Sequence, residues 1–234
     1  MKILLSRTKA SNYRSAKRLE DLGFETVSLA LSEVVDTGAE IAASPVHGYI
    51  LTSSNAARIL GLRNSNIKGP FYVVGERTKA ALLDCGLSDV RYVARNAKHL
   101  GDFIATEYQV RKFTYIAGEQ RAFDFDKYFE NYELTVDIVE LYRIERIDPG
   151  LEKMKEALSK AEGGIHLHYS SLSAVNFFEL IQKYSLESYS KSMRALGISK
   201  KTSLAVDNLL VKSVHNAKIE SEDEMIKTLE SFRR

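Results

Sequence analysis

The sequence predicts an α/β protein built on parallel sheets, and three observations lead to this fold class. Short apolar segments of strand length alternate with segments whose apolar residues recur at the helical period. Small polar residues follow several of the apolar segments, as expected where a strand leads into a helix. Similar polar turns occur in both halves of the chain. Alternating strands and helices are typical of parallel sheets that are covered on both faces.

The expected strands are short, apolar and mostly rich in β-branched or aromatic residues. They lie at 3–5, 24–29, 31–35, 49–52, 71–74, 90–93, 113–117, 134–139 and 165–169. The strand at 134–139 continues as an extended segment through Ile144. We expect these strands to form the interior of the sheets.

Apolar residues spaced three or four apart predict the helices, and glycine follows several of them. In the first helix, for example, Ala16, Leu19 and Leu22 share one face and Gly23 comes next. The expected helices lie at 6–22, 78–83, 100–108, 123–132 and 151–161, with others that begin near Asn55 and Ser221. The last of these has a capping box in Ser221 and Glu224.

Three segments of the first half return in the second half in the same order. Residues 49–60 read YILTSSNAARIL, and LHYSSLSAVNFFEL at 167–180 matches them with Ser53 aligned to Ser171, an offset of 118 (171 − 53). Segment 75–82 matches 199–206, and Asn-Ala-Lys at 96–98 recurs at 216–218. This period is too long for a solenoid, so the pattern indicates two similar halves.

Composition narrows the function classes. The net charge is +2, which lacks the basic excess that is usual for nucleic-acid binding. The single cysteine, Cys85, cannot form an internal disulfide, and it fits a reducing compartment. No stretch approaches the length of a membrane span, and we see no signal-peptide core. We therefore expect a cytoplasmic protein that binds neither nucleic acid nor membranes.

The repeated polar turns are candidate anion sites, because each follows an expected strand and precedes a helix. Backbone N–H groups point outward at such helix starts, and open α/β sheets bind ligands along this edge. Arg7, Arg77, Lys79 and Lys201 lie near these strand ends and would add charge-assisted contacts to a substrate that carries carboxylates. The alternative for each is an ordinary solvent-exposed side chain.

The sequence shows no cofactor or metal motif. It contains neither a Walker loop nor a G-x-G-x-x-G segment. His166 and His168 share one face of a strand, as metal ligands do, but no third ligand stands at a recognisable spacing. We expect these histidines to be structural, Cys85 to be a packing residue, and the protein to need no cofactor.

The motifs resemble those of the uroporphyrinogen-III synthase family. The resemblance depends on the T-S-x-x-A turn that follows a strand at 52–56, its second copy at 170–174, the G-x-x-T-x-x-A-L turn at 75–82, the Gly118-Glu119 turn, and Tyr142 in a strand similar to the family's V-x-x-Y-x-T. It covers essentially the whole chain. The departures are Ser54 and Leu172 where the family usually has proline, Ser199 in place of glycine, and Ile144 where the family often has threonine.

The resemblance implies two flavodoxin-like α/β domains with parallel sheets, joined by a two-stranded linker. Domain 1 would comprise 1–31 and 146–234, domain 2 would comprise 38–138, and 32–37 with 139–145 would form the link. It also implies a cofactor-independent lyase of tetrapyrrole (heme) biosynthesis. Such an enzyme cyclises hydroxymethylbilane to uroporphyrinogen III with loss of water and inversion of ring D. We expect a monomer that receives its substrate from the upstream bilane-forming enzyme.

The same resemblance assigns site residues. Tyr142 would donate a proton as the hydroxyl group leaves, since a phenol carries its proton at neutral pH. The substrate-binding residues would be Arg7, Thr52, Ser53, Ser54, Asn55, Gly75, Arg77, Thr78, Gly118, Glu119, Ser170, Ser171, Ser173, Ser199, Lys201 and Thr202. The departures leave open a non-catalytic bilobed module of the same fold that binds a tetrapyrrole or another anion. A two-domain sugar- or phosphate-binding protein is a third reading, but that class usually carries an export signal.

Overall fold

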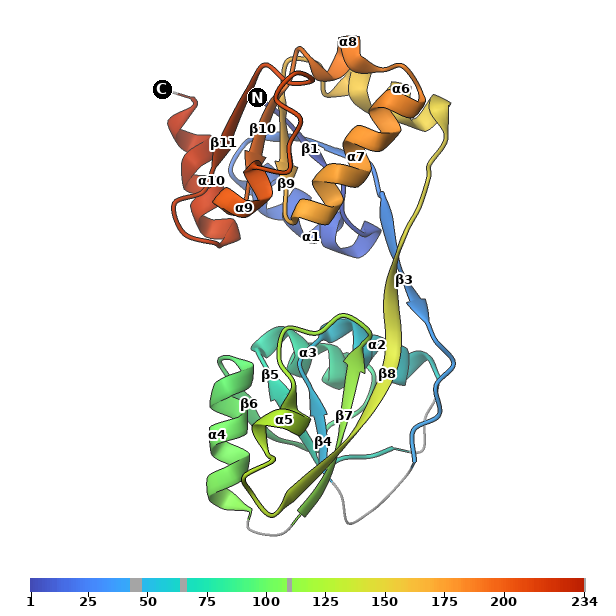
Figure 1. The fold of residues 1–234 in the computed structure, drawn as a ribbon, viewed down its shortest axis with the longest axis vertical. Coiled ribbons are helices and arrows are strands. Elements are labelled where there is room, and N and C mark those ends of the chain that lie inside the picture. Colours follow the sequence, from blue (N-terminus) through green and yellow to red (C-terminus); the bar gives the residue numbers. More distant parts are fainter. Residues whose placement is uncertain (43–47, 64–66, 109–110, 234) are drawn as a thin grey trace. The chain divides into compact units, whose positions relative to one another are not determined.

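The chain forms two compact units in a computed structural model that describes residues 1–42, 48–63, 67–108 and 111–233 (Figure 1). Unit 1 combines Met1–Glu33 with Glu145–Arg234, and unit 2 is the intervening segment Val34–Ile144. Both units are α/β, which confirms the predicted fold class. Within the described ranges, no helix has the length and apolar character needed to cross a bilayer.

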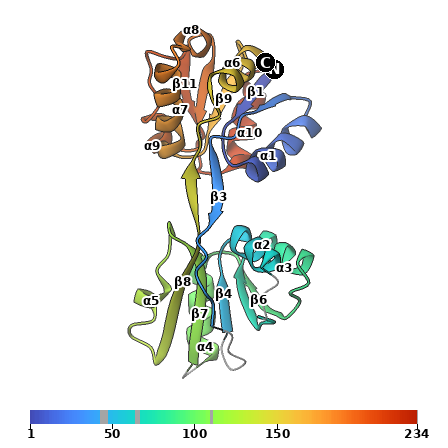
Figure 2. The ribbon, with the colours of Figure 1, turned by 90° about the vertical axis from the view of Figure 1, so that its right-hand side faces the viewer.

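Unit 1 is built on a five-stranded sheet with the order β11-β10-β9-β1-β2, and all neighbours are parallel. Its strands are β1 (Lys2–Leu5), β2 (Glu25–Ser28), β9 (Ile165–His168), β10 (Arg194–Gly197) and β11 (Ser213–Asn216). Its helices are α1 (Lys9–Asp21), α6 (Leu151–Lys160), α7 (Ser171–Lys183), α8 (Glu187–Ser190), α9 (Lys200–Ser203) and α10 (Glu222–Ser231). Helices α6 and α7 cover one face of this sheet, and α1 and α10 cover the other (Figure 2).

Unit 2 is built on a six-stranded sheet with the order β3-β8-β7-β4-β5-β6. Its strands are β3 (Ser32–Asp36, which begins in unit 1), β4 (Gly48–Leu51), β5 (Phe71–Val74), β6 (Val90–Ala94), β7 (Arg111–Gly118) and β8 (Leu134–Arg146). Its helices are α2 (Ser54–Leu62), α3 (Glu76–Asp84), α4 (Ala97–Glu107) and α5 (Phe125–Tyr128). Strands β4 to β8 are parallel. Helices α2 and α3 pack on one face, and α4 and α5 on the other.

Strand β3 runs antiparallel to β8. The N–H of Thr37 donates to the carbonyl of Leu141 (3.1 Å), and the N–H of Ile147 donates to that of Leu31 (3.1 Å). Residue numbers therefore rise along one strand as they fall along the other. Strand β8 is continuous from Leu134 to Arg146, and thus includes the extended segment expected after residue 139.

The two units have the same strand order but a circularly permuted chain. The order β2-β1-β9-β10-β11 of unit 1 corresponds to β8-β7-β4-β5-β6 of unit 2. In unit 1 the segment β1-α1-β2 comes first along the chain, whereas its counterpart β7-α5-β8 comes last in unit 2. A sequence repeat that matches β4 with β9 and β5 with β10 is therefore out of phase with the units.

Helix capping corrects the register of that repeat. Ser53 caps α2, and its Oγ accepts the N–H of Asn55 (3.1 Å). Ser170, rather than Ser171, caps α7 and accepts the N–H of Ser173 (3.1 Å). Because the cap fixes where the helix begins, Ser53 is equivalent to Ser170, and the offset is 117 (170 − 53) rather than 118.

Two helices are shorter than the periodicity predicts. The helix expected at 123–132 is a single turn, α5, because turns occupy the chain up to β8. The helix expected at 6–22 begins only at Lys9, since Thr8 caps it by accepting the N–H of Ser11 (3.3 Å). At the start of α1, the polar side chain of Thr8 favours a cap over helix interior.

Candidate functional site

Tyr142 lies in β8 at the point where the neighbouring strand β7 ends. Gly118, the last residue of β7, is paired with Tyr142 in the sheet register. A Cβ atom at residue 118 would stand 2.7 Å from Cζ of the Tyr142 ring, so a larger side chain would displace the ring. The next residue, Glu119, is exposed, and its N–H donates to the Tyr142 carbonyl (2.9 Å). Gly118 and Glu119 thus fix both the ring and the backbone of Tyr142.

The hydroxyl group of Tyr142 donates a hydrogen bond to Oγ of Ser53 (2.9 Å). Ser53 stands between the end of β4 and the start of α2, and its Oγ also accepts the N–H of Asn55. Tyr142 is only 8% exposed, whereas Ser53 and Asn55 are partly exposed. The structure therefore brings together the predicted proton donor and the predicted serine turn, which are far apart in the sequence.

A second tyrosine supports the same turn. The hydroxyl groups of Thr52 and Tyr115 share a hydrogen bond of 2.8 Å. Tyr115 lies on β7 and is 1% exposed, and burial raises the pKa of its phenol. Sequence reasoning missed Tyr115 because a tyrosine between apolar neighbours on a strand reads as a packing residue. Its hydroxyl, which needs a partner when buried, was the available signal.

The glycine turn after β5 starts α3. Gly75 is the N-cap residue and has φ of +79°, a conformation that glycine adopts without strain. Thr78 is buried in the first turn of α3, and its N–H donates to the Gly75 carbonyl (3.0 Å). Arg77 is exposed. Ser54, at the start of α2, is buried and accepts a hydrogen bond from Arg58 (3.3 Å).

The corresponding turns of unit 1 are also capped helix starts. Oγ of Ser171 donates to the carbonyl of Lys201 (3.2 Å), which ties α7 to α9. Ser199 caps α9 and accepts the N–H of Thr202 (3.3 Å), so serine replaces the family's glycine without loss of the turn. Thr202 is buried, whereas Lys201 is exposed.

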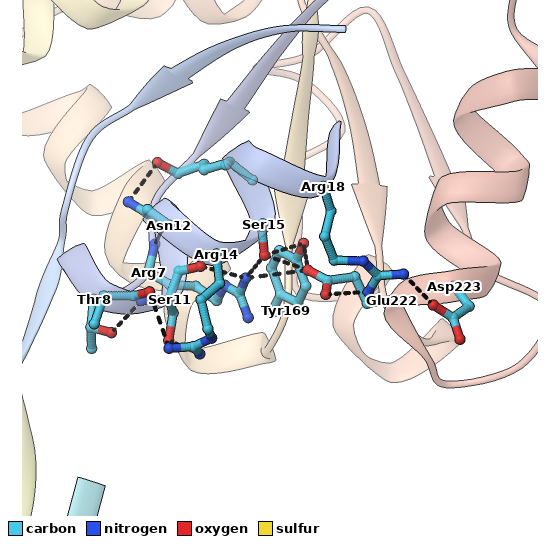
Figure 3. A network of polar contacts seen from close by, with 12 residues as sticks. Arg7, Thr8, Ser11, Asn12, Arg14, Ser15, Arg18, Tyr169, Glu222 and Asp223 are labelled. Carbon is cyan, nitrogen blue, oxygen red and sulfur yellow. Dashed lines mark hydrogen bonds and ion pairs between the residues drawn. The ribbon is translucent and has the colours of Figure 1, made fainter. Parts of the chain in front are cut away.

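Arg7 follows β1 and belongs to a polar network of unit 1 (Figure 3). Its guanidinium lies 3.4 Å from the ring centroid of Tyr169, the residue that follows β9. It also forms an ion pair with Glu222 at the start of α10 (3.4 Å). The Tyr169 hydroxyl donates to the same carboxylate (2.6 Å), as does the guanidinium of Arg18 (2.9 Å). Ser15 contacts both Arg7 and Glu222.

This network places a carboxylate of the protein against the predicted substrate-binding Arg7. Burial raises the pKa of Glu222, but hydrogen bonds from Ser15 and Tyr169 and the charge of Arg7 outweigh burial and lower it overall. Glu222 is therefore ionised and balances the charge of Arg7. Sequence reasoning missed Glu222 and Tyr169, because nothing in the local pattern links the chain ends to residue 169.

The two histidines of β9 are core residues. His166 and His168 are 2% and 0% exposed, and their ring centroids lie 3.9 Å apart. Nε2 of His166 lies 2.6 Å from Oγ of Ser6, while both ring nitrogens of His168 are buried without a hydrogen-bond partner. Among the described residues, no three or more histidine, cysteine or acidic side chains are grouped as metal ligands would be.

Comparisons with known proteins identify the family of the chain. The family model described as uroporphyrinogen-III synthase HemD matches residues 14–227. The solved uroporphyrinogen-III synthetase of Helicobacter pylori 26695 is 17% identical, with a TM-score of 0.65 over 99% of both chains. Uroporphyrinogen III synthase of Thermus thermophilus is 14% identical, with a TM-score of 0.43 over 100% of both chains. No curated protein sequence matches. The family match spans most of the chain, so this protein belongs to the uroporphyrinogen-III synthase family.

Proposed function

We propose that the protein cyclises hydroxymethylbilane to uroporphyrinogen III, with loss of water and inversion of ring D. The observation that carries this proposal is the hydrogen bond between Tyr142 and Ser53 at the carboxyl edge of the sheet of unit 2, in a chain of this family. Loss of the substrate hydroxyl needs a proton, and this pair supplies two hydroxyl groups at one point. Electron release from the pyrrole nitrogen drives the C–O cleavage, so the residues need only position the bilane and move protons.

The helix starts are the proposed carboxylate-binding sites. The substrate carries eight carboxylates, which favours several dispersed sites over one strongly basic pocket. Backbone N–H groups at the first turns of α2, α3 and α7 are suited to this task, because a helix N-terminus carries a partial positive charge. Arg7 would contribute less to carboxylate binding, because its charge is already balanced by the ion pair with Glu222.

The decisive experiment is an assay with hydroxymethylbilane that resolves isomer III from the spontaneously formed isomer I. We expect the wild type to form isomer III and Tyr142→Phe to lower the turnover by about 10²- to 10⁴-fold, the usual range for acid–base groups. Tyr72→Phe is a matched control, because Tyr72 is also buried in unit 2 and its hydroxyl contacts that of Tyr108. A wild type that yields only isomer I would favour the non-catalytic binding module.

We also propose a monomeric, cytoplasmic enzyme whose two domains are linked by 32–37 and 139–145 and which accepts substrate from the bilane-forming enzyme. The single cysteine and the near-neutral charge support the compartment, and the family supports the rest. Light scattering during size exclusion would test the monomer. A coupled assay with an inactive competitor for the bilane would test direct transfer.

A further inference from the structure

We infer that Ser53 donates the proton to the leaving hydroxyl group and that Tyr142 then donates its own proton to Ser53. This two-hydroxyl relay rests on the proposed cyclisation and refines it by assigning the contact with the substrate oxygen to serine. Tyr142 then acts through Ser53 rather than on the substrate itself. The direction of one hydrogen bond and the exposure of its two partners support this order of transfer.

The direction of the hydrogen bond favours the relay. Tyr142 is the donor and Oγ of Ser53 is the acceptor, so the phenolic proton already points at the serine. Ser53 accepts a second hydrogen bond from the N–H of Asn55. Within the part of the chain that the structure describes, the Ser53 hydroxyl donates to no other group. Its hydrogen is therefore the one that remains to be given to a ligand.

The exposure of the two side chains supports the same order of proton transfer, from Tyr142 to Ser53 to the substrate. Tyr142 is 8% exposed, and its ring is enclosed by Gly118 and by the core that includes Leu51 and Ala56. Ser53 is partly exposed at the carboxyl edge of the sheet. A substrate oxygen at this edge meets the serine before it meets the buried phenol. Direct donation by Tyr142 would require the phenol to release Ser53 first.

A serine can cap a helix in this protein without a hydrogen bond from a tyrosine. Ser170 caps α7 in the equivalent position of unit 1, yet in the described structure its side chain forms hydrogen bonds only with Ser173 of the same turn. Ser221 caps α10 through the N–H of Glu224, again with no phenol involved. The Tyr142–Ser53 hydrogen bond is thus an addition to the cap in unit 2.

In the relay, the Oγ–H proton of Ser53 moves to the hydroxyl oxygen of the bilane. The C–O bond then breaks, and water leaves with the electron pair of that bond. The nitrogen lone pair of the pyrrole stabilises the resulting cation, and the phenolic proton of Tyr142 moves to Ser53. When the macrocycle closes, the pyrrole α-carbon that forms the last ring bond loses its proton. That proton returns to the phenolate of Tyr142, so the enzyme is regenerated.

The test compares Ser53→Gly, Ser53→Thr, Tyr142→Phe and the double variant Ser53→Gly/Tyr142→Phe in the isomer-resolved assay. Glycine caps a helix nearly as well as serine, and threonine keeps a hydroxyl group. We expect Ser53→Gly to lower kcat about as much as Tyr142→Phe, by about 10²- to 10⁴-fold, with KM changed less than threefold. Ser53→Thr should recover at least a tenth of the wild-type kcat. The double variant should be no slower than the slower single variant, because a serial relay is broken only once.

Asn96→Ala is the control for a lost cap in the same unit, since Asn96 caps α4 by accepting the N–H of His99 (2.8 Å). It should keep kcat within twofold of wild type even where its melting temperature falls. A Ser53→Gly enzyme with near wild-type kcat would overturn the relay while leaving the proposed function intact. Losses that multiply in the double variant would also overturn it. A wild type that makes no isomer III would refute the proposed function and the relay together.

Discussion

Acidification between pH 7.5 and 5 should weaken unit 1 selectively, because two neutral histidines lie in its core. His166 and His168 face the helix α7, where the rings of Phe177 and Phe178 contact them. Neighbouring strands offer Leu4 and residues 195 and 197 at the paired positions, none of which carries a charge. Apart from the two histidines themselves, no titratable group of the described residues acts on their charges.

Burial lowers the pKa of both imidazoles, that of His168 to about 3, and the charge of His168 lowers that of His166 further. Below the ordinary histidine pKa of 6.5, the unfolded chain therefore binds protons that the folded unit does not. The stability that the neutral rings allow is complete above pH 6.5 and is lost as the pH falls toward the folded pKa. From pH 7.5 to 5 the loss from His168 is about 2 kcal/mol, and His166 adds a loss in the same direction.

Hydrogen exchange followed by mass spectrometry separates the two units. Peptides from β9 and α7 should lose protection by at least about 2 kcal/mol of opening free energy between pH 7.5 and 5, after correction for the intrinsic exchange rate. Peptides from β4 and β5 of unit 2 should change much less. The carboxylates whose pKa values are lowered, such as Asp148 at about 2, protonate below this window and do not interfere.

The matched variant is His168→Leu, which removes one titrating ring and keeps an apolar side chain. Whatever its effect at pH 7.5, its further loss between pH 7.5 and 5 should be about 2 kcal/mol smaller than that of the wild type. His215, whose pKa burial also lowers, is present in both proteins and cancels. Equal pH dependence in the wild type and in His168→Leu would refute the reasoning.

Three further changes test the structure. Gly118→Ala should push the Tyr142 ring aside and lower turnover at least tenfold, and an unchanged rate would show that the ring position is not critical. Ser170→Ala should cost unit 1 about 1 kcal/mol in chemical denaturation, because α7 loses its cap, and an undiminished midpoint would contradict this. Arg233→Ala should lower the melting temperature of unit 1, since its guanidinium stacks on Phe24 (3.6 Å) and donates to the carbonyls of Leu22 and Gly23. A melting temperature equal to wild type would assign those contacts no net stability.

Local patterns predicted the fold class because they act over short distances. Strand β4 is a run of apolar residues, and the capped start of α2 follows it directly. Both elements could therefore be predicted from a segment of twelve residues. Strands β10 and β11 were missed. They read RALG and SVHN, too short and too polar to form an apolar run, and they are strands because β9 pairs with β10 and β10 with β11. Their structure is a tertiary effect.

The site depends on contacts between residues that are distant in the sequence. For this reason the residue pairs of the site could not be predicted from local patterns. Tyr142 and Ser53 were each proposed as site residues, but nothing in either segment shows that one donates to the other across 89 positions. Glu222 lies 215 residues from Arg7 and sits in a capping box that reads as ordinary helix start. The family resemblance supplied the tyrosine, and only the folded chain supplies its partner.

The equivalent edges of the two units carry different side chains. Arg7 lies two residues beyond the end of β1, whereas Gly118 is the last residue of the equivalent strand β7. The missing side chain makes room for the ring of Tyr142, whereas Arg7 stacks on Tyr169 and is neutralised by Glu222. We therefore propose the edge of unit 2 as the place of proton transfer. Since Glu222 balances the charge of Arg7, we also propose that the helix starts of each unit supply much of the attraction for a polycarboxylate.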